Sequence, residues 1–187
     1  VETRRVPARG DRILLDDLRE AMDDQTRVLA ISHVEFASGF RNDLDAIGEL
    51  CRSRGVAFFV DAIQGLGPHV LDVRRTPVDF AAADSHKWLL GPEGAGFLYV
   101  RREWIDRLRP IGVGWHSVTG SFSAPGLDFT LKPNAQRWEG GSCNMPGLQG
   151  FAASMRLLSG IGRAEVSARL LDRAEAVRRA VVEAGWR

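Results

Sequence analysis

The sequence has few cysteines, no long hydrophobic run and almost no charge imbalance, and each absence excludes a class of protein. Two cysteines, Cys51 and Cys143, cannot form a disulfide framework, and no Cys/His cluster has zinc-ligand spacing. No apolar run approaches the roughly 18 residues of a membrane span. The net charge of +1 gives no reason to expect nucleic acid as a partner. These absences favour a cytoplasmic enzyme without a metal site, which binds neither nucleic acid nor membrane.

The sequence also lacks an initiator Met and, near its start, the apolar core of a signal peptide. It opens on an expected strand over residues 2–7 and stops just after Gly185, which is expected to end a helix. These features predict a piece of a longer protein. Its 187 residues fit one domain and part of a second.

What the sequence does contain is an alternation of buried strands and helices. Apolar runs predict strands over 27–33, 56–60, 78–83 and 96–100. Helices are expected over 16–22 and between Asp43 and Gly55. This alternation predicts an α/β domain with a mainly parallel central sheet.

The last third of the chain reads differently. Residues 119–137 predict an irregular loop or a short hairpin. A helix is expected from Pro146 to about Gly160, and a long amphipathic helix from Arg163. We therefore expect a partial large domain over 1–160 and the start of a small α+β C-terminal domain over 161–187.

Polar residues follow several of the predicted strands at the point where each strand ends. His33, Asp61 and residues 84–87 occupy such positions. Because ligands of parallel α/β sheets bind outside the carboxyl ends of the strands, we expect these residues to converge on one edge.

Lys87 can be interpreted in two ways from the sequence. It is an ordinary surface lysine, or it is a partly desolvated amine that forms a Schiff base. Asp61 is either a turn cap or the carboxylate that keeps a pyridine nitrogen protonated, as pyridoxal 5'-phosphate (PLP) requires. Gln64, one helical turn later, is a surface amide or a donor to a ring hydroxyl.

At this point the residues resemble a known family. Residues 60–67 (VDAIQGLG), followed by 85–88 (SHKW), are similar to the cofactor signature of class V aminotransferase-type PLP enzymes, of fold type I. That family includes cysteine desulfurases, isopenicillin N epimerase, kynureninase and several aminotransferases. Residues 31–39, 91–94 and 137–144 (RWEGGSCN) extend the resemblance over nearly the whole chain.

The resemblance implies a role for each matching residue. Lys87 would carry PLP as a Schiff base and move the α-proton of an amino-acid substrate. Asp61 would pair with the pyridinium nitrogen, Gln64 would contact the ring hydroxyl, and His33 would face the same ring oxygen. The phosphate would be bound by His86, by Ser85 and, across a homodimer interface, by Ser142.

One departure from the family concerns Asp84. Desulfurases show Ser-Gly-His-Lys where this sequence has Asp84-Ser85-His86-Lys87. A carboxylate at Asp84 would repel a phosphate unless it turned away or oriented its neighbours, so the phosphate hydroxyl is expected from Ser85 or from a residue outside this chain.

Several alternatives stay open. The reaction is transamination, desulfuration or another lyase reaction, or epimerisation, because the groups that select among them are not in the sequence. His116 touches the substrate or is a solvated loop histidine, and Cys143 is a small filler or a neighbour of the phosphate. A catalytically silent nucleotide-binding or scaffolding module is the competing hypothesis, although Gly94-Ala95-Gly96 precedes a strand and not a helix. We expect the chain on its own to be poorly stable and inactive, because a sheet that lacks strands exposes apolar surface.

Overall fold

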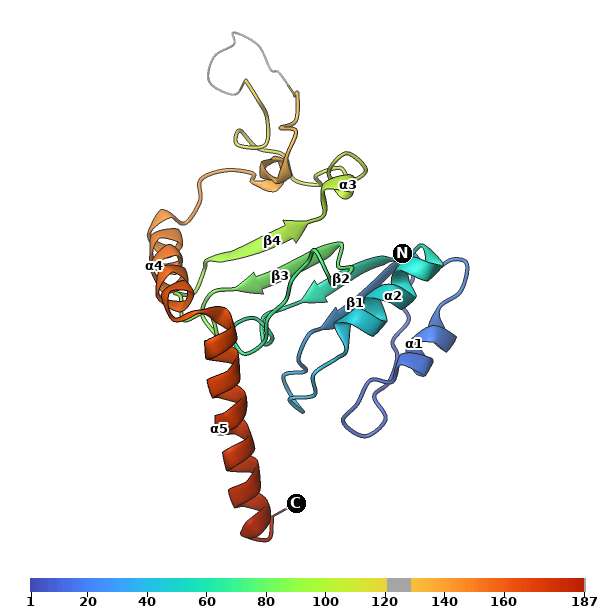
Figure 1. Ribbon diagram of the computed structural model, residues 1–187. Coiled ribbons are helices and arrows are strands. Elements are labelled where there is room, and N and C mark those ends of the chain that lie inside the picture. The colour runs from blue at the N-terminus through green and yellow to red at the C-terminus, as the bar shows by residue number, and fades with distance from the viewer. Residues whose placement is uncertain (121–128, 187) are drawn as a thin grey trace.

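A four-stranded sheet forms the centre of the protein, seen in a computed structural model that describes residues 1–120 and 129–186 (Figure 1). The strands lie in the order β1 (Val28–Ser32), β2 (Ala57–Asp61), β3 (Phe80–Asp84) and β4 (Gly96–Val100). The first three run parallel, and β4 is antiparallel to β3. The predicted α/β fold with a mainly parallel sheet is therefore confirmed.

One face of the sheet is covered by helix α2 (Leu44–Arg54), with the short helix α1 (Leu15–Ala21) beside it. The carboxylate of Asp43 accepts a hydrogen bond from the Ala46 amide at 3.0 Å and starts α2, and Gly55 ends it in a left-handed conformation (φ 66°). Helices and strands enclose a buried apolar cluster that includes Leu18, Leu44, Ile47, Leu50, Cys51, Phe58, Val60 and Val78.

The opposite face of the sheet carries exposed apolar side chains. Val28 of β1 is 57% exposed and Leu98 of β4 is 48% exposed. Helix α3 (Arg102–Ile105) covers one corner, where the ring of Trp104 packs on Phe80 with centroids 5.3 Å apart. An apolar sheet face open to solvent is what we expected of this chain, and the low stability of the chain on its own stays a prediction.

Two helices complete the chain. α4 (Met145–Ile161) and α5 (Arg163–Glu183) are separated only by Gly162, whose φ of 97° suits glycine. Helix α5 projects away from the sheet and has no buried residue (Figure 1). Its expected apolar face is open to solvent, with Val177 63% exposed. The division into domains near Gly160 stays a prediction.

The N-terminal segment differs from what the sequence predicts. Residues 2–7 form no strand, so that prediction is wrong; no described strand lies beside them to pair with, and Arg4 instead donates to the Asp23 carboxylate at 2.8 Å. The irregular loop or short hairpin expected over 119–137 falls partly outside the described residues. An antiparallel bridge joins Val118 to Leu131, and the 3-10 helix η1 (Ala135–Trp138) follows Leu131.

No helix of residues 1–120 and 129–186 is long and apolar enough to cross a membrane. Within the same residues, no group of three or more His, Cys, Asp or Glu side chains could hold a metal ion.

Candidate active site

Asp61 lies at the carboxyl end of β2, directly opposite Ser32 at the end of β1. Its carboxylate accepts a hydrogen bond from the Ser32 hydroxyl at 3.2 Å and one from the Ile63 amide at 3.0 Å. No described residue forms an ion pair with this half-buried carboxylate. It is therefore oriented by the fold and still able to accept from a cationic N–H.

Gln64 connects the turn after β2 with the turn after β3. Its side-chain oxygen accepts a hydrogen bond from the indole nitrogen of Trp88 at 3.2 Å. Gly67 lies against the same residue, because a Cβ at this position would stand 2.7 Å from the Trp88 carbonyl oxygen. The two turns thus pack on each other, which brings the segment that contains Asp61 beside the segment that contains Lys87.

Lys87 sits in a tight turn that follows β3. Its carbonyl accepts from the Leu90 amide at 3.0 Å, and Leu90 has a left-handed backbone (φ 56°), which costs a non-glycine residue about 1 kcal/mol. The lysine side chain is half-buried, and none of the described residues forms a hydrogen bond or ion pair with it. An amine and a carboxylate without ion-pair partners, which follow neighbouring strands, are the two groups that a PLP ring needs.

Ser85 is fully buried under this turn. Its hydroxyl donates to the Pro92 carbonyl at 2.5 Å, and its own carbonyl accepts from the Gly91 amide at 2.8 Å. The hydroxyl therefore holds the turn closed. Direct contact between Ser85 and a phosphate stays a prediction, and the structure gives the hydroxyl another partner.

His86 and Asp84 lie on opposite sides of Ser85 in the sequence and face each other. The Nδ1 atom of His86 is 3.9 Å from a carboxylate oxygen of Asp84, and the histidine side chain is 30% exposed. This arrangement turns the Asp84 carboxylate toward the imidazole and leaves the other ring nitrogen, Nε2, for a ligand.

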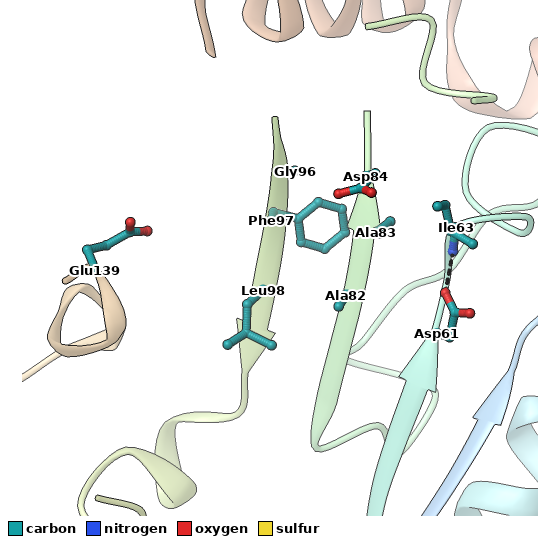
Figure 2. Close-up of a pocket in the computed structure, with 9 residues that line it drawn as sticks. All are labelled: Asp61, Ile63, Ala82, Ala83, Asp84, Gly96, Phe97, Leu98 and Glu139. Carbon is teal, nitrogen blue, oxygen red and sulfur yellow. Dashed lines mark hydrogen bonds between the residues drawn. The ribbon is translucent and has the colours of Figure 1, made fainter. Parts of the chain in front are cut away.

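An open depression of about 350 Å³ lies on the exposed face of the sheet at the ends of β2 and β3. Asp61 and Asp84 lie along its strand-end margin, and Glu139 faces the sheet across it (Figure 2). The remaining lining is mostly apolar: Ile63, Ala82, Ala83, Gly96, Phe97 and Leu98. Three carboxylates around an apolar floor would attract a cationic or proton-donating ring in preference to an anion.

His33 lies elsewhere. It is 6% exposed, lines a second depression with His69 and Arg41, and packs so closely on Gly65 that a Cβ there would stand 2.2 Å from its Nδ1 atom. Burial, the chief cause, together with His69 and Arg41 lowers the pKa of His33 to about 4, so the ring is neutral at pH 7. Direct cofactor contact by His33 stays a prediction. In this structure its ring packs on Gly65, in the turn that follows Asp61.

Ser142 is exposed in the segment that joins η1 to α4. Two residues later, Asn144 fixes this segment: its side-chain nitrogen donates to the Gly94 carbonyl at 3.0 Å. Upstream, the buried Arg137 donates to the Lys132 carbonyl at 2.8 Å and to the Ile105 carbonyl. Ser142 is thus held by its neighbours, although it contacts none of the Lys87 turn, and its role toward a second subunit stays a prediction.

The loop that carries His116 is joined to the same segment. The buried Ser117 hydroxyl accepts from the Gly114 amide at 3.2 Å and donates to the Glu139 carbonyl at 3.1 Å. His116 itself packs edge-on against Trp115. Cys143 contacts the Glu139 carboxylate, with its sulfur 3.8 Å from Oε2.

Three contributors to the site are not among the residues predicted from the sequence. Ser32 could have been found, because it ends a predicted strand beside the one that ends at Asp61. Trp88 is part of the recognised motif, but nothing in the sequence indicates that its indole reaches Gln64. Glu139 approaches the sheet only through the tertiary arrangement of η1.

Comparison with known proteins agrees with this geometry. The sequence model described as aminotransferase class-V matches residues 3–183. The chain belongs to the aminotransferase class-V family. Among curated relatives, the uncharacterized aminotransferase YcbU of Bacillus subtilis is 32% identical over 157 residues, which are 84% of this chain and 41% of that protein. The cysteine desulfurase IscS of Shewanella baltica is 45% identical over 102 residues, covering 54% of this chain and 25% of the relative.

Solved structures of related enzymes share the fold. A cysteine desulfurase from Thermococcus onnurineus superposes with a TM-score of 0.79 at 26% identity, over 90% of this chain and 41% of that one. A variant of the lyase C-DES, with glycine covalently linked to its PLP cofactor, gives 0.83 at 28% identity, over 89% and 44%. The resemblance to class V PLP enzymes, and with it the enzyme family, is confirmed. The chain spans less than half the length of these relatives.

Proposed function

We propose that the complete protein that contains this chain is a PLP-dependent enzyme, which acts on an amino acid by aminotransferase or cysteine desulfurase/lyase chemistry. The observation that carries the proposal is the pairing of two turns. Asp61 and Lys87 leave neighbouring strands, neither has an ion-pair partner among the described residues, and the bond between Gln64 and Trp88 holds their turns together.

The residues present fit this cofactor. The Lys87 amine would attach the PLP aldehyde as a Schiff base. The Asp61 carboxylate, oriented by Ser32 and the Ile63 amide, would accept a hydrogen bond from the N–H of the pyridinium ring and so keep that nitrogen protonated. The side-chain nitrogen of Gln64 would donate to the ring oxygen, since its oxygen is already used by Trp88.

The phosphate would be bound by His86 through Nε2, while Nδ1 faces Asp84. Ser85 would act by holding the turn closed, and His33 by packing behind the turn that contains Gln64. In a homodimer in the cytoplasm, Ser142 would reach the phosphate of the neighbouring subunit. The exposed position of Ser142 supports this arrangement.

Bound PLP supplies an electron sink for the charge that develops at the α-carbon of an amino acid. Asp61 would hold the nitrogen of the ring protonated, which that chemistry requires. The Lys87 amine would hold and move the α-proton of the substrate. Residues of the complete protein that are not in this chain select the final reaction.

The test uses the complete protein with added PLP. The wild type should develop the yellow absorption band of a Schiff base, and borohydride should fix the cofactor to one peptide. The chain itself has two lysines, Lys87 and Lys132, and peptide mapping of the complete protein distinguishes them from each other and from lysines elsewhere. Lys87→Ala should abolish the band and Lys132→Ala should keep it. A wild-type protein without the band, or with the cofactor fixed to Lys132, would contradict the proposal.

The same protein can then be assayed for the two reaction types. Release of sulfide from cysteine would indicate desulfurase or lyase chemistry, and transfer of an amino group to a keto acid would indicate an aminotransferase. Asp61→Asn, which keeps the size and removes the charge, should lower either activity without abolishing the fixation to Lys87.

A further inference from the structure

We propose that Trp88 is a positioning residue, which holds the Gln64 amide so that its nitrogen faces the ring oxygen of the cofactor. This inference rests on the proposed function. It assigns a role to the residue directly after Lys87, which has no role in the chemistry described above.

The first argument comes from the hydrogen-bonding groups. An indole nitrogen can only donate a hydrogen bond, whereas a glutamine side chain presents an acceptor oxygen and a donor nitrogen. The Nε1 atom of Trp88 is 3.2 Å from Oε1 of Gln64. The contact therefore selects one of the two amide orientations, with the oxygen toward Trp88 and the NH2 group left for a ligand.

The chosen orientation is the one that a PLP ring needs. The ring oxygen of PLP carries negative charge when it is deprotonated, so an amide oxygen facing it would be repelled and an N–H attracted. A freely rotating Gln64 would spend part of its time in the wrong orientation. Trp88 removes that alternative before the cofactor binds, which is preorganisation of a binding group.

The second argument is that Trp88 itself is fixed. Gly67 packs on its backbone, where a Cβ would stand 2.7 Å from the carbonyl oxygen and 2.8 Å from the Trp88 Cβ. The turn closed by the Leu90 amide and the Lys87 carbonyl fixes the chain on either side of it. The indole is 43% exposed, so its N–H contributes to orientation much more than to the buried core.

The experiment follows the binding of PLP to the complete protein by its absorption and determines the equilibrium dissociation constant. Trp88→Phe keeps an aromatic ring and removes the N–H. It should raise the dissociation constant for PLP about fivefold, as expected for the loss of one neutral hydrogen bond that orients a binding group, and shift the pH at which the Schiff-base band titrates. Trp186→Phe is the matched control, because this 71% exposed residue lies beyond the C-terminal end of α5. It should change neither the dissociation constant nor the pH at which the band titrates.

A double-mutant cycle separates orientation from packing. If Trp88 acts through Gln64, Trp88→Phe should have no further effect in a Gln64→Ala protein. Trp88→His, which restores an N–H donor on a smaller ring, should recover part of the affinity and provides a second variant if Trp88→Phe folds poorly.

The failures are distinguishable. A wild type without the Schiff-base band overturns the proposed function. A normal band with an unchanged dissociation constant and titration in Trp88→Phe overturns only the role of Trp88. The same loss in the Gln64→Ala background would show that the indole supports the fold and not the amide, and would also overturn it.

Discussion

The side-chain nitrogen of Asn144 donates a hydrogen bond to the Gly94 carbonyl at 3.0 Å, while its oxygen accepts from the Gly147 amide at 3.1 Å. One side chain thus starts helix α4 and ties it to the Gly-rich turn that follows Lys87. The positive φ of Gly94 (73°) leaves that carbonyl accessible for the contact. The segment from Glu139 to Asn144 is therefore coupled to the lysine turn, although fifty residues separate Gly94 and Asn144.

Two substitutions of Asn144 should separate its functions. Asn144→Asp keeps the helix cap and loses the donor to Gly94, so the free energy of unfolding should fall by about 0.5–1 kcal/mol. Asn144→Ala loses both contacts and should cost about 1 kcal/mol more. Urea denaturation of the complete protein gives the order wild type, Asp, Ala. An equal loss in both variants would mean that the contact with Gly94 contributes nothing.

Ser85→Ala tests the two roles considered for this hydroxyl. The substitution keeps the Cβ that packs on Gly91 and leaves the Pro92 carbonyl without the hydrogen bond from Ser85. We expect a loss of stability of about 1–2 kcal/mol and an affinity for PLP changed by less than about tenfold. An affinity that falls a hundredfold with unchanged stability would instead assign Ser85 to the phosphate.

The strands and the larger helices of this chain could be predicted from the sequence, because buried parallel strands read as continuous apolar runs and Asp43 and Gly55 are clear helix boundaries. Residues 2–7 could not. A strand forms only where a neighbour supplies backbone partners, and no local pattern in these mostly polar residues reveals such a neighbour.

The site was predictable in part for the same reason. The strand-end rule and the family motif identified the neighbourhood of Asp61, His86 and Lys87. They could not show that Ser85 is turned inward, or that His33 packs behind Gly65, because both depend on which side of a turn a side chain leaves. Long-range contacts such as that between Gln64 and Trp88 leave no periodic signal in the sequence.

Gly65 should not tolerate a side chain, although its backbone has no unusual conformation. A Cβ would stand 2.2 Å from Nδ1 and 2.5 Å from Cγ of His33, whose ring is too rigid to yield. Gly65→Ala should therefore destabilise the complete protein by about 1–3 kcal/mol. In a His33→Ala background, where the ring is absent, the same change should cost much less. Additive losses in thermal or urea denaturation would show that the ring does not limit this position.

The buried imidazole of His33 should make stability depend on pH in a defined window. Burial lowers its pKa in the folded protein to about 4, whereas in the unfolded chain the pKa is near 6.5. Between these values the unfolded chain binds a proton that the folded protein does not. The contribution of His33 to the free energy of unfolding is therefore fully present above pH 6.5. It is lost as the pH is lowered toward 4, by at most about 3 kcal/mol.

Denaturation of the complete protein at pH 7 and at pH 4.5 measures this loss. Protonation of carboxylates such as Asp72, whose pKa lies below its ordinary value, also lowers the free energy of unfolding at lower pH. These groups therefore add to the acid side of the curve. The contribution of His33 is isolated by His33→Phe, which keeps a flat ring and cannot titrate. The stability of this variant should fall less between pH 7 and pH 4.5 than that of the wild type. Curves of equal slope would mean that the His33 ring takes up its proton in the folded protein as easily as in water.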